Sequence, residues 1–171
     1  MNKPSSKKTA FGIVASLALL CVPVMGAGDS LRGQSDRAET ARTLEGTWWV
    51  TVTLYDCITH QERPPFVSLL AFAKGGTMSE TTANTAFQPG QRTSGYGTWE
   101  DAPGGTYNST DVAFILFTAG PFAQGTQRIN HSITVSPGGV QFNDEATVQF
   151  FDTNGNLIAS GCARAVGTRL Q

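Results

Sequence analysis

The chain has few of the side chains that bind metal ions or act as nucleophiles. Its 171 residues include three cysteines and two histidines, His60 and His131. Neither a Cys-x-x-Cys pair nor a His-Glu-x-x-His motif is present, so the sequence predicts no metal site and no bound cofactor. A nucleophile elbow, a phosphate-binding loop and a paired-carboxylate motif are also missing, and we assign no catalytic residue. A site assembled from distant residues remains compatible with this pattern.

Long apolar runs are scarce too, and the one that occurs lies at the N-terminus. Three lysines precede an apolar stretch at 11–25, which small residues follow at 26–28. This is the pattern of a secretory signal peptide, and the run is short for a membrane span. We therefore predict a signal peptide at 1–27, no integral membrane segment in the mature chain, and a secreted or periplasmic location.

The predicted mature chain has no excess of positive charge. Removal of residues 1–27 takes away three lysines and leaves nine basic against 13 acidic side chains, a net charge of −4. A mildly acidic surface disfavours nucleic acid and anionic lipid as partners. We therefore expect a small hydrophobic molecule as the partner, with a protein partner as the alternative.

Signal removal also takes away one cysteine, Cys21, and leaves Cys57 and Cys162. Cys21 follows Leu20, whereas attachment of a lipid anchor would need a small residue at that place. Two cysteines in an exported chain most simply form one disulfide, and two buried free thiols are the alternative. Closing a loop of about a hundred residues stabilises a fold by about 4–5 kcal/mol in the chain-entropy model.

No long segment has the apolar periodicity of a helix. The polar stretch 28–43 is interpreted as a linker, and residues 44–171 are enough for one domain with one core. In this domain, apolar and polar residues alternate in segments separated by Gly, Pro, Asn and Asp, which is typical of antiparallel strands. We expect eight strands, at 46–57, 66–73, 77–82, 95–100, 106–117, 126–136, 140–151 and 157–170.

Eight strands in sequential hairpins can close as an up-and-down barrel, which has no exposed edge and encloses room for one small ligand. A sandwich with Greek-key connections is the alternative. It is disfavoured because 95–170 contains no connection long enough to cross between two sheets. The sequence therefore predicts an all-β, eight-stranded antiparallel up-and-down β-barrel.

The two ends of the domain fit each other as antiparallel neighbours. Antiparallel registers that agree to within two residues place Cys57 opposite Cys162 and Trp48 beside Arg169. Large residues of the first strand then face Ala and Gly of the last, and the disulfide lies on the outer face. We predict a cation–π contact between Trp48 and Arg169 at the closed end. A β-bulge in the last strand would give this role to Arg164 instead.

Gly46 and Trp48 at the start of the domain and an arginine in its last strand resemble the lipocalin or calycin group, in which a Trp and an Arg close the narrow end. The resemblance covers residues 44–171 in strand order. The Thr-Asp-Tyr tripeptide and the C-terminal helix of typical lipocalins are not found, so the chain resembles a calycin-like cousin. The tripeptides at 97–99 and 167–169 also look like those of small exported bacterial barrels.

Two polar residues interrupt faces that are otherwise apolar. His131 shares a face with Ile129 and Ile133, and Asp144 shares one with Val140 and other apolar residues of the seventh strand. A buried imidazole beside a carboxylate keeps its charge to higher pH and can orient a ligand or move a proton. The alternatives are a histidine bonded within the wall or exposed at the rim, and a bulge at Asp144.

The turn between the sixth and seventh strands sets which residues meet. If Ser136 and Val140 are its ends, Asp144 lies near Ser132 and His131 lies near Glu145.

We hypothesise an exported barrel that binds a small, largely apolar ligand. Its cavity would be lined by Trp99, Phe114, Phe142 and the small residues of the last strand, with His131 and Asp144 as polar contacts. One alternative is a protease inhibitor or interaction module that acts through the loops at 58–65, 83–94 and 118–124. Another is a barrel-cavity cyclase or isomerase. The absence of a catalytic motif favours binding over catalysis.

Overall fold

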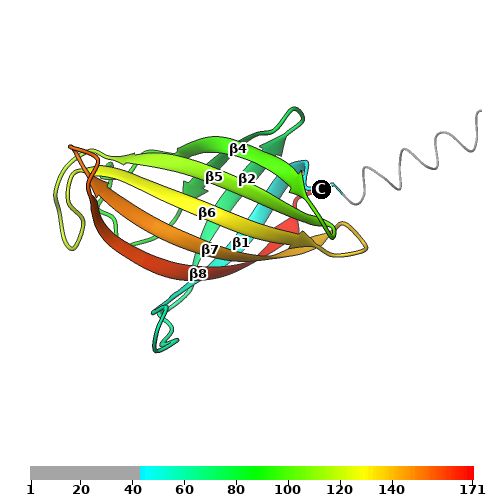
Figure 1. Cartoon of the computed structure of the whole chain (residues 1–171), viewed down its shortest axis with the longest axis horizontal. Coiled ribbons are helices and arrows are strands. Elements are labelled where there is room, and N and C mark those ends of the chain that lie inside the picture. The colour runs from blue at the N-terminus through cyan, green and yellow to red at the C-terminus, as the bar shows by residue number, and fades with distance from the viewer. Residues whose placement is uncertain (1–42) are drawn as a thin grey trace, which may run out of the picture.

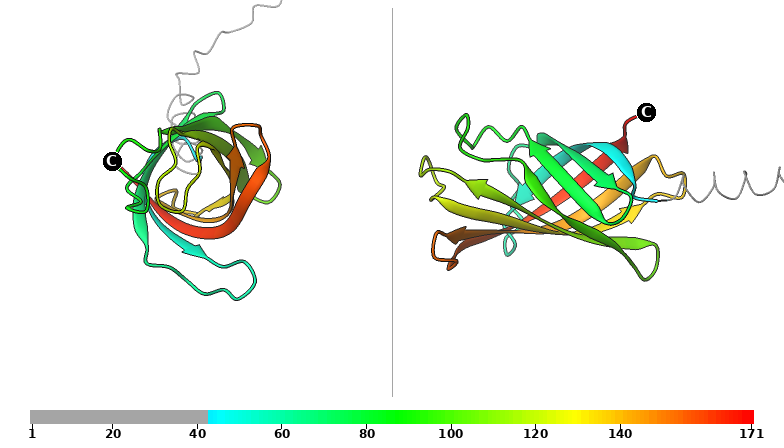
Figure 2. Two further views of the ribbon diagram at one scale, coloured as in Figure 1. Left: turned by 90° about the vertical axis from the view of Figure 1, so that its left-hand side faces the viewer. Right: turned by 90° about the horizontal axis from the view of Figure 1, so that it is seen from above.

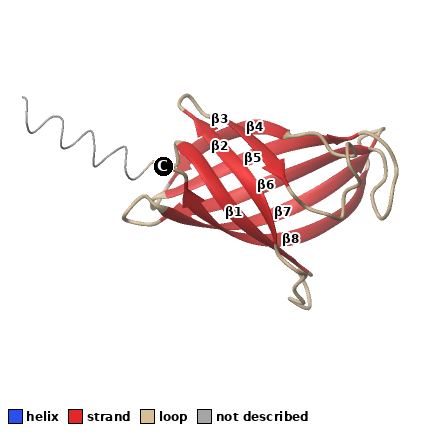
Figure 3. Ribbon diagram, turned by 180° about the vertical axis from the view of Figure 1, so that it is seen from behind, coloured by secondary structure: helices blue, strands red, loops and turns tan. Residues whose placement is uncertain are grey.

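The computed structural model describes residues 43–171, which form a closed barrel of eight antiparallel strands (Figure 1). The predicted signal peptide and nearly all of the predicted linker lie outside these residues. The strands follow each other around the barrel in chain order (Figure 3). They are β1 (Gly46–Tyr55), β2 (Phe66–Ala73), β3 (Thr77–Thr82), β4 (Gly95–Ala102), β5 (Thr106–Ile115), β6 (Gly125–Val135), β7 (Gln141–Asp152) and β8 (Leu157–Arg169). The predicted fold class is confirmed.

Pairing of β1 with β8 closes the barrel. Trp48 lies opposite Arg169 in this pair, as the sequence predicts, and the register continues without a shift to Tyr55 opposite Cys162. The predicted inner face of β1 is correct, because Trp48 and Val50 are buried whereas Trp49 and Thr51 are exposed. The bulge that would bring Arg164 to the closed end does not occur.

The two ends of the barrel differ in their connections. Tight turns join β2 to β3, β4 to β5 and β6 to β7 at the end where the C-terminus lies. Longer loops join β1 to β2, β3 to β4 and β5 to β6 at the other end, together with the turn between β7 and β8. The view along the barrel shows the strands as a ring, with these loops at the near end (Figure 2). We call the first end the closed end and the second the mouth.

A buried tryptophan and an arginine fill the closed end. The guanidinium carbon of Arg169 lies 4.2 Å from the ring centroid of Trp48, which is fully buried. Phe142 also packs against Trp48, with the two ring centroids 4.9 Å apart. The Trp48 indole N–H donates to the carbonyl of Leu44 at 2.9 Å, which satisfies its one polar group. The predicted cation–π pair is therefore confirmed.

Gly46 leaves the space that this pair needs. Its φ is +123°, and a Cβ at this position would lie 2.7 Å from Nη1 of Arg169. Both the backbone conformation and the close approach of the guanidinium require glycine. The Gly-x-Trp pattern at 46–48 is thus explained by contacts with one arginine 123 positions later in the chain.

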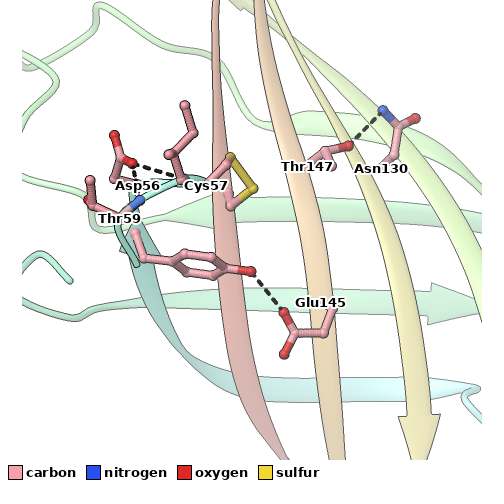
Figure 4. The surroundings of a disulfide bond; sticks show 9 residues. Asp56, Cys57, Thr59, Asn130, Glu145 and Thr147 are labelled. Carbon is pink, nitrogen blue, oxygen red and sulfur yellow. Dashed lines mark hydrogen bonds between the residues drawn. A yellow bond between two sulfur atoms is a disulfide. The ribbon is translucent and has the colours of Figure 1, made fainter. Parts of the chain in front are cut away.

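The disulfide joins Cys57, just beyond β1, to Cys162 in β8 (Figure 4). Their Cα atoms are 5.3 Å apart. Cys57 follows two residues after Tyr55, the strand partner of Cys162, so the bridge runs diagonally rather than between directly paired residues. Asp56 accepts hydrogen bonds from the amides of Ile58 and Thr59 and turns the chain away from the barrel at this point.

The structure corrects the predicted start of the seventh strand. β7 begins at Gln141, and Val140 is 53% exposed in the preceding turn instead of facing inward. Ser136 bonds to Gln141, so the turn is one residue longer than predicted. As a result, His131 lies opposite Ala146 and Ile133 lies opposite Asp144. The predicted neighbours Glu145 and Ser132 are wrong by one position. The register shift of β7 against β8 lies at Phe150 and Phe151, not at Asp144.

Truncation of the closed-end tryptophan tests this core. We expect Trp48→Ala to lower the free energy of unfolding by about 3–5 kcal/mol, because it removes a fully buried ring. Trp49→Ala is the matched control, since Trp49 is 49% exposed on the outer face, and it should cost less than about 1 kcal/mol. Urea denaturation measures both. Equal losses for the two variants would contradict the assignment of Trp48 to the core.

Candidate functional site

A cavity of about 490 Å³ occupies the half of the barrel toward the mouth. Aliphatic residues of β1 and β7 line it, among them Val50, Val52, Leu54, Ala146 and Val148. Ligand pockets for small molecules commonly have volumes of about 300–1,000 Å³ and mostly apolar walls. The size and lining of this cavity therefore match those of a small-molecule site.

The small residues of β8 make this space. Ala159, Gly161, Ala163 and Ala165 face the interior and all line the cavity. A Cβ built on Gly161 would have no atom within 4 Å, so this part of the wall borders open space. The predicted contact of large β1 residues with small β8 residues is confirmed, and its consequence is an unfilled interior.

Three aromatic rings gather at the mouth. Phe87 from the β3–β4 loop stacks on Phe122 from the β5–β6 loop, with ring centroids 4.2 Å apart. Phe122 in turn contacts Phe150 of β7 at 5.2 Å. All three rings line the cavity. Two loops that are far apart in the sequence are thus packed together over the entrance.

The inner end of the cavity holds a buried trio of ionisable groups, Asp111, His131 and Asp144. Nδ1 of His131 is 2.7 Å from Oδ2 of Asp144, and Nε2 is 3.1 Å from Oδ1 of Asp111. The three side chains are 7% exposed or less. They come from neighbouring strands β6, β7 and β5, where alternation places each on the inner face.

The two carboxylates keep His131 charged. Burial by itself lowers the pKa of the imidazole, but hydrogen bonds and charge interactions with Asp111 and Asp144 outweigh it and raise the pKa to about 10. Both ring nitrogens then carry a proton, and both protons are donated to carboxylates. His131 is therefore an imidazolium at neutral pH with no further hydrogen bond to offer.

A second buried polar group lies beside the trio. Glu80 of β3 forms an ion pair with Arg92 at 2.7 Å and accepts a hydrogen bond from Ser68 of β2 at 3.1 Å. The Arg92 guanidinium also donates through Nε to the side chain of Gln127 in β6. Burial raises the pKa of the Glu80 carboxyl, while the charge of Arg92 opposes this shift. Glu80 and Arg92, together with the trio, form the polar inner end of the cavity, which we call the polar floor.

Arg92 points inward because its loop is fixed by its neighbour. Gln91 is fully buried, and its side-chain amide donates to the carbonyls of Phe117 and Ala119 at 3.1 and 3.0 Å. Its backbone carbonyl accepts from the amide of Leu116. These bonds attach the β3–β4 loop to the end of β5 and hold Arg92 at the barrel interior.

Gly95 provides the room for Asp111. A Cβ on Gly95 would lie 2.2 Å from Oδ2 of Asp111 and 3.4 Å from Oε2 of Glu80. Two carboxylates thus approach the same backbone position of β4. Because no side chain separates them, the negative charge of Asp111 further raises the pKa of Glu80.

The predicted contact residues are divided among three places. His131 and Asp144 line the cavity. Trp99 and Phe142 lie in the core of the closed end, where Trp99 packs against Phe72 and Tyr107. Phe114 is 60% exposed on the outer face of β5, because Ala113 and Ile115 take the inward positions. Its predicted place in the cavity is wrong.

Sequence reasoning missed Asp111, Glu80, Arg92 and Gln127. Two of them share a strand face with other inward residues: Glu80 lies on the face of Met78 and Thr82, and Asp111 lies on that of Ser109 and Ala113. Both strands also carry polar residues on the outer face, so the inner face cannot be recognised from polarity. Arg92 lies in a loop, where no periodicity applies.

Comparison with known proteins found no matching family model, no similar curated protein and no similar solved structure. The closed eight-stranded barrel is consistent with a calycin-like fold. Among residues 43–171, no group of three or more His, Cys, Asp or Glu side chains is arranged to hold a metal ion. The same part of the chain contains no helix with the length and apolar character to cross a membrane.

The raised pKa of His131 gives a pH dependence of stability. The pKa is about 10 in the folded protein and near 6.5 for an unperturbed histidine, so the folded state stabilises the charged form of the ring. This contribution is complete below pH of about 6.5 and is lost as the pH rises through about 10. We expect the free energy of unfolding of the wild type, relative to His131→Gln, to fall by several kcal/mol over that interval in urea denaturation.

The wild-type protein alone gives a second measurement. Ring ¹⁵N chemical shifts of His131 at pH 8 should show two protonated nitrogens. A neutral ring at that pH would contradict the charged trio.

Proposed function

We propose that this protein is an exported, lipocalin-like barrel that binds a small, largely apolar molecule in its interior. The observation that carries the proposal is the cavity of about 490 Å³, which has an apolar wall and ends at a buried polar floor. An apolar cavity with a few convergent polar groups is the usual form of a small-molecule site. The contact of Trp48 with Arg169 supports the likeness to lipocalins, since it closes the opposite end.

Export agrees with the covalent structure. The disulfide between Cys57 and Cys162 fits a protein outside the reducing cytoplasm. Secretion itself rests on the predicted signal peptide at 1–27.

The mouth loops fit this function better than a role as an independent interaction surface. A filled interior would favour a module that acts through its loops, but the mouth half of the barrel is open. Phe87 and Phe122, from two of these loops, turn their rings to the cavity and line it. These two loops therefore form part of the cavity wall.

The buried trio also bears on catalysis. A barrel-cavity isomerase needs an ionisable residue deep inside, and His131 and Asp144 occupy such positions. Proton transfer from His131 at neutral pH would require the ring to give up a proton that is hydrogen-bonded to a carboxylate, at a pKa of about 10. The optimum for a general base lies near the working pH, so the trio favours ligand binding over acid–base chemistry.

Filling the cavity tests the proposal. Gly161→Phe places a ring in open space inside the barrel, because a Cβ there meets nothing within 4 Å. We expect at least tenfold weaker binding of N-phenyl-1-naphthylamine, a neutral apolar fluorescent probe, and a Tm within about 3 °C of the wild type. Thr168→Phe is the matched control, since Thr168 is exposed on the outer face of the same strand, and it should leave probe binding unchanged.

Native mass spectrometry of the protein purified from its own cells complements this test. A stoichiometric small molecule that Gly161→Phe does not retain would support the proposal. Equal probe binding by the wild type and by Gly161→Phe would contradict it.

A further inference from the structure

The floor of the cavity carries one negative charge in excess. Glu80 and Arg92 balance each other as an ion pair. In the trio, a single imidazolium lies between two carboxylates, Asp111 and Asp144. The net charge of the trio is −1 wherever its shared protons sit, because moving a proton from the ring to a carboxylate changes both charges together. The five buried groups therefore sum to −1.

A ligand in the cavity would meet the charge of the trio at Asp144. Both nitrogens of His131 are already engaged, so the ring has nothing to donate. Oδ2 of Asp111 is buried against Gly95, and Asp111 does not line the cavity. Asp144 lines the cavity, is 2% exposed, and has a buried Oδ1 without a hydrogen-bond partner among the described residues. Oδ1 of Asp144 is therefore the oxygen for which a bound molecule would supply the missing partner.

The sign of the excess decides between two kinds of polar ligand. Arg92 also lines the cavity, and its Nη2 has no partner in the described part of the chain. An anion bound there would add a second unbalanced negative charge to a buried site, because Glu80 already neutralises Arg92. A cation at Asp144 would bring the cluster to neutrality. Buried charges are tolerated when they are paired, so the cation is favoured.

We propose that the cavity selects a small molecule with an apolar body and one protonated amine, whose ammonium group binds Oδ1 of Asp144. The aliphatic wall formed by Val52, Leu54, Ala146 and Val148 takes the apolar body, and the ammonium lies at the polar floor. This inference rests on the proposed function and adds the chemical class of the ligand to it.

Three probes of one chain length test the inference: n-octylamine, n-octanol and octanoate, titrated by calorimetry into the full protein at pH 7. We expect the amine to bind at least tenfold more tightly than the alcohol, and the alcohol more tightly than the carboxylate. Equal affinities, or tighter binding of octanoate, would overturn the inference and leave the proposed function in place. No binding of any probe would contradict both.

Charge-neutral variants locate the effect. Asp144→Asn should weaken octylamine binding at least tenfold and change octanol binding less than twofold. Glu80→Gln removes a negative charge from the other part of the cluster, so the ratio of amine to carboxylate affinity should fall at least tenfold even if Asp144→Asn fails to fold. Glu145→Gln is the matched control: Glu145 is next to Asp144 but exposed on the outer face. An equal loss of amine affinity in Glu145→Gln would show surface attraction and overturn the inference.

Discussion

The antiparallel pairing of β1 with β8 is the constraint on which the rest of the barrel depends. It joins the first and last strands, so every strand has two neighbours and no edge is left exposed. It also sets Trp48 against Arg169 at one end. Farther along, the same register places aliphatic residues of β1 beside Ala and Gly of β8. The plug and the cavity are therefore two consequences of one alignment.

The polar floor of the cavity is best understood as a compromise between stability and recognition. Apolar residues in place of a buried ion-pair network often leave stability unchanged or increase it. Here five ionisable groups from four strands and one loop remain in the interior. Each has a partner of opposite charge, which offsets the loss of hydration. Among the buried oxygens without a hydrogen-bond partner in the described residues, Oδ1 of Asp144 belongs to a carboxylate that lines the cavity, where a ligand can pair with it.

Particular residues show what the sequence reveals and what it conceals. The contact of Trp48 with Arg169 was predictable, because nearly the same antiparallel register pairs Trp48 with Arg169 and Cys57 with Cys162. The inward position of His131 was predicted because it shares a strand face with Ile129 and Ile133. The length of the turn after β6 was predicted wrongly, because its Gly-rich sequence allows several lengths. One extra residue in the turn shifts every β6–β7 partner by one position. Phe114 was misplaced because both faces of β5 carry apolar residues. Asp111 joins the site through the pairing of β5 with β6, and Arg92 joins it through the hydrogen bonds that fix its loop to the end of β5.

The way Arg169 is bound has a consequence for how such a barrel changes during evolution. Its guanidinium donates to the backbone carbonyls of Thr43, Glu45 and Gly139 and lies over the ring of Trp48. Carbonyl acceptors are the same in every residue, so the side chains at 43 and 45 can vary without loss of these bonds, whereas position 139, with a φ of +69°, favours glycine. We therefore expect selection on the closed end to act on Gly46, Trp48 and Arg169. Barrels closed in this way can vary at the residues that supply only a backbone carbonyl while retaining one architecture.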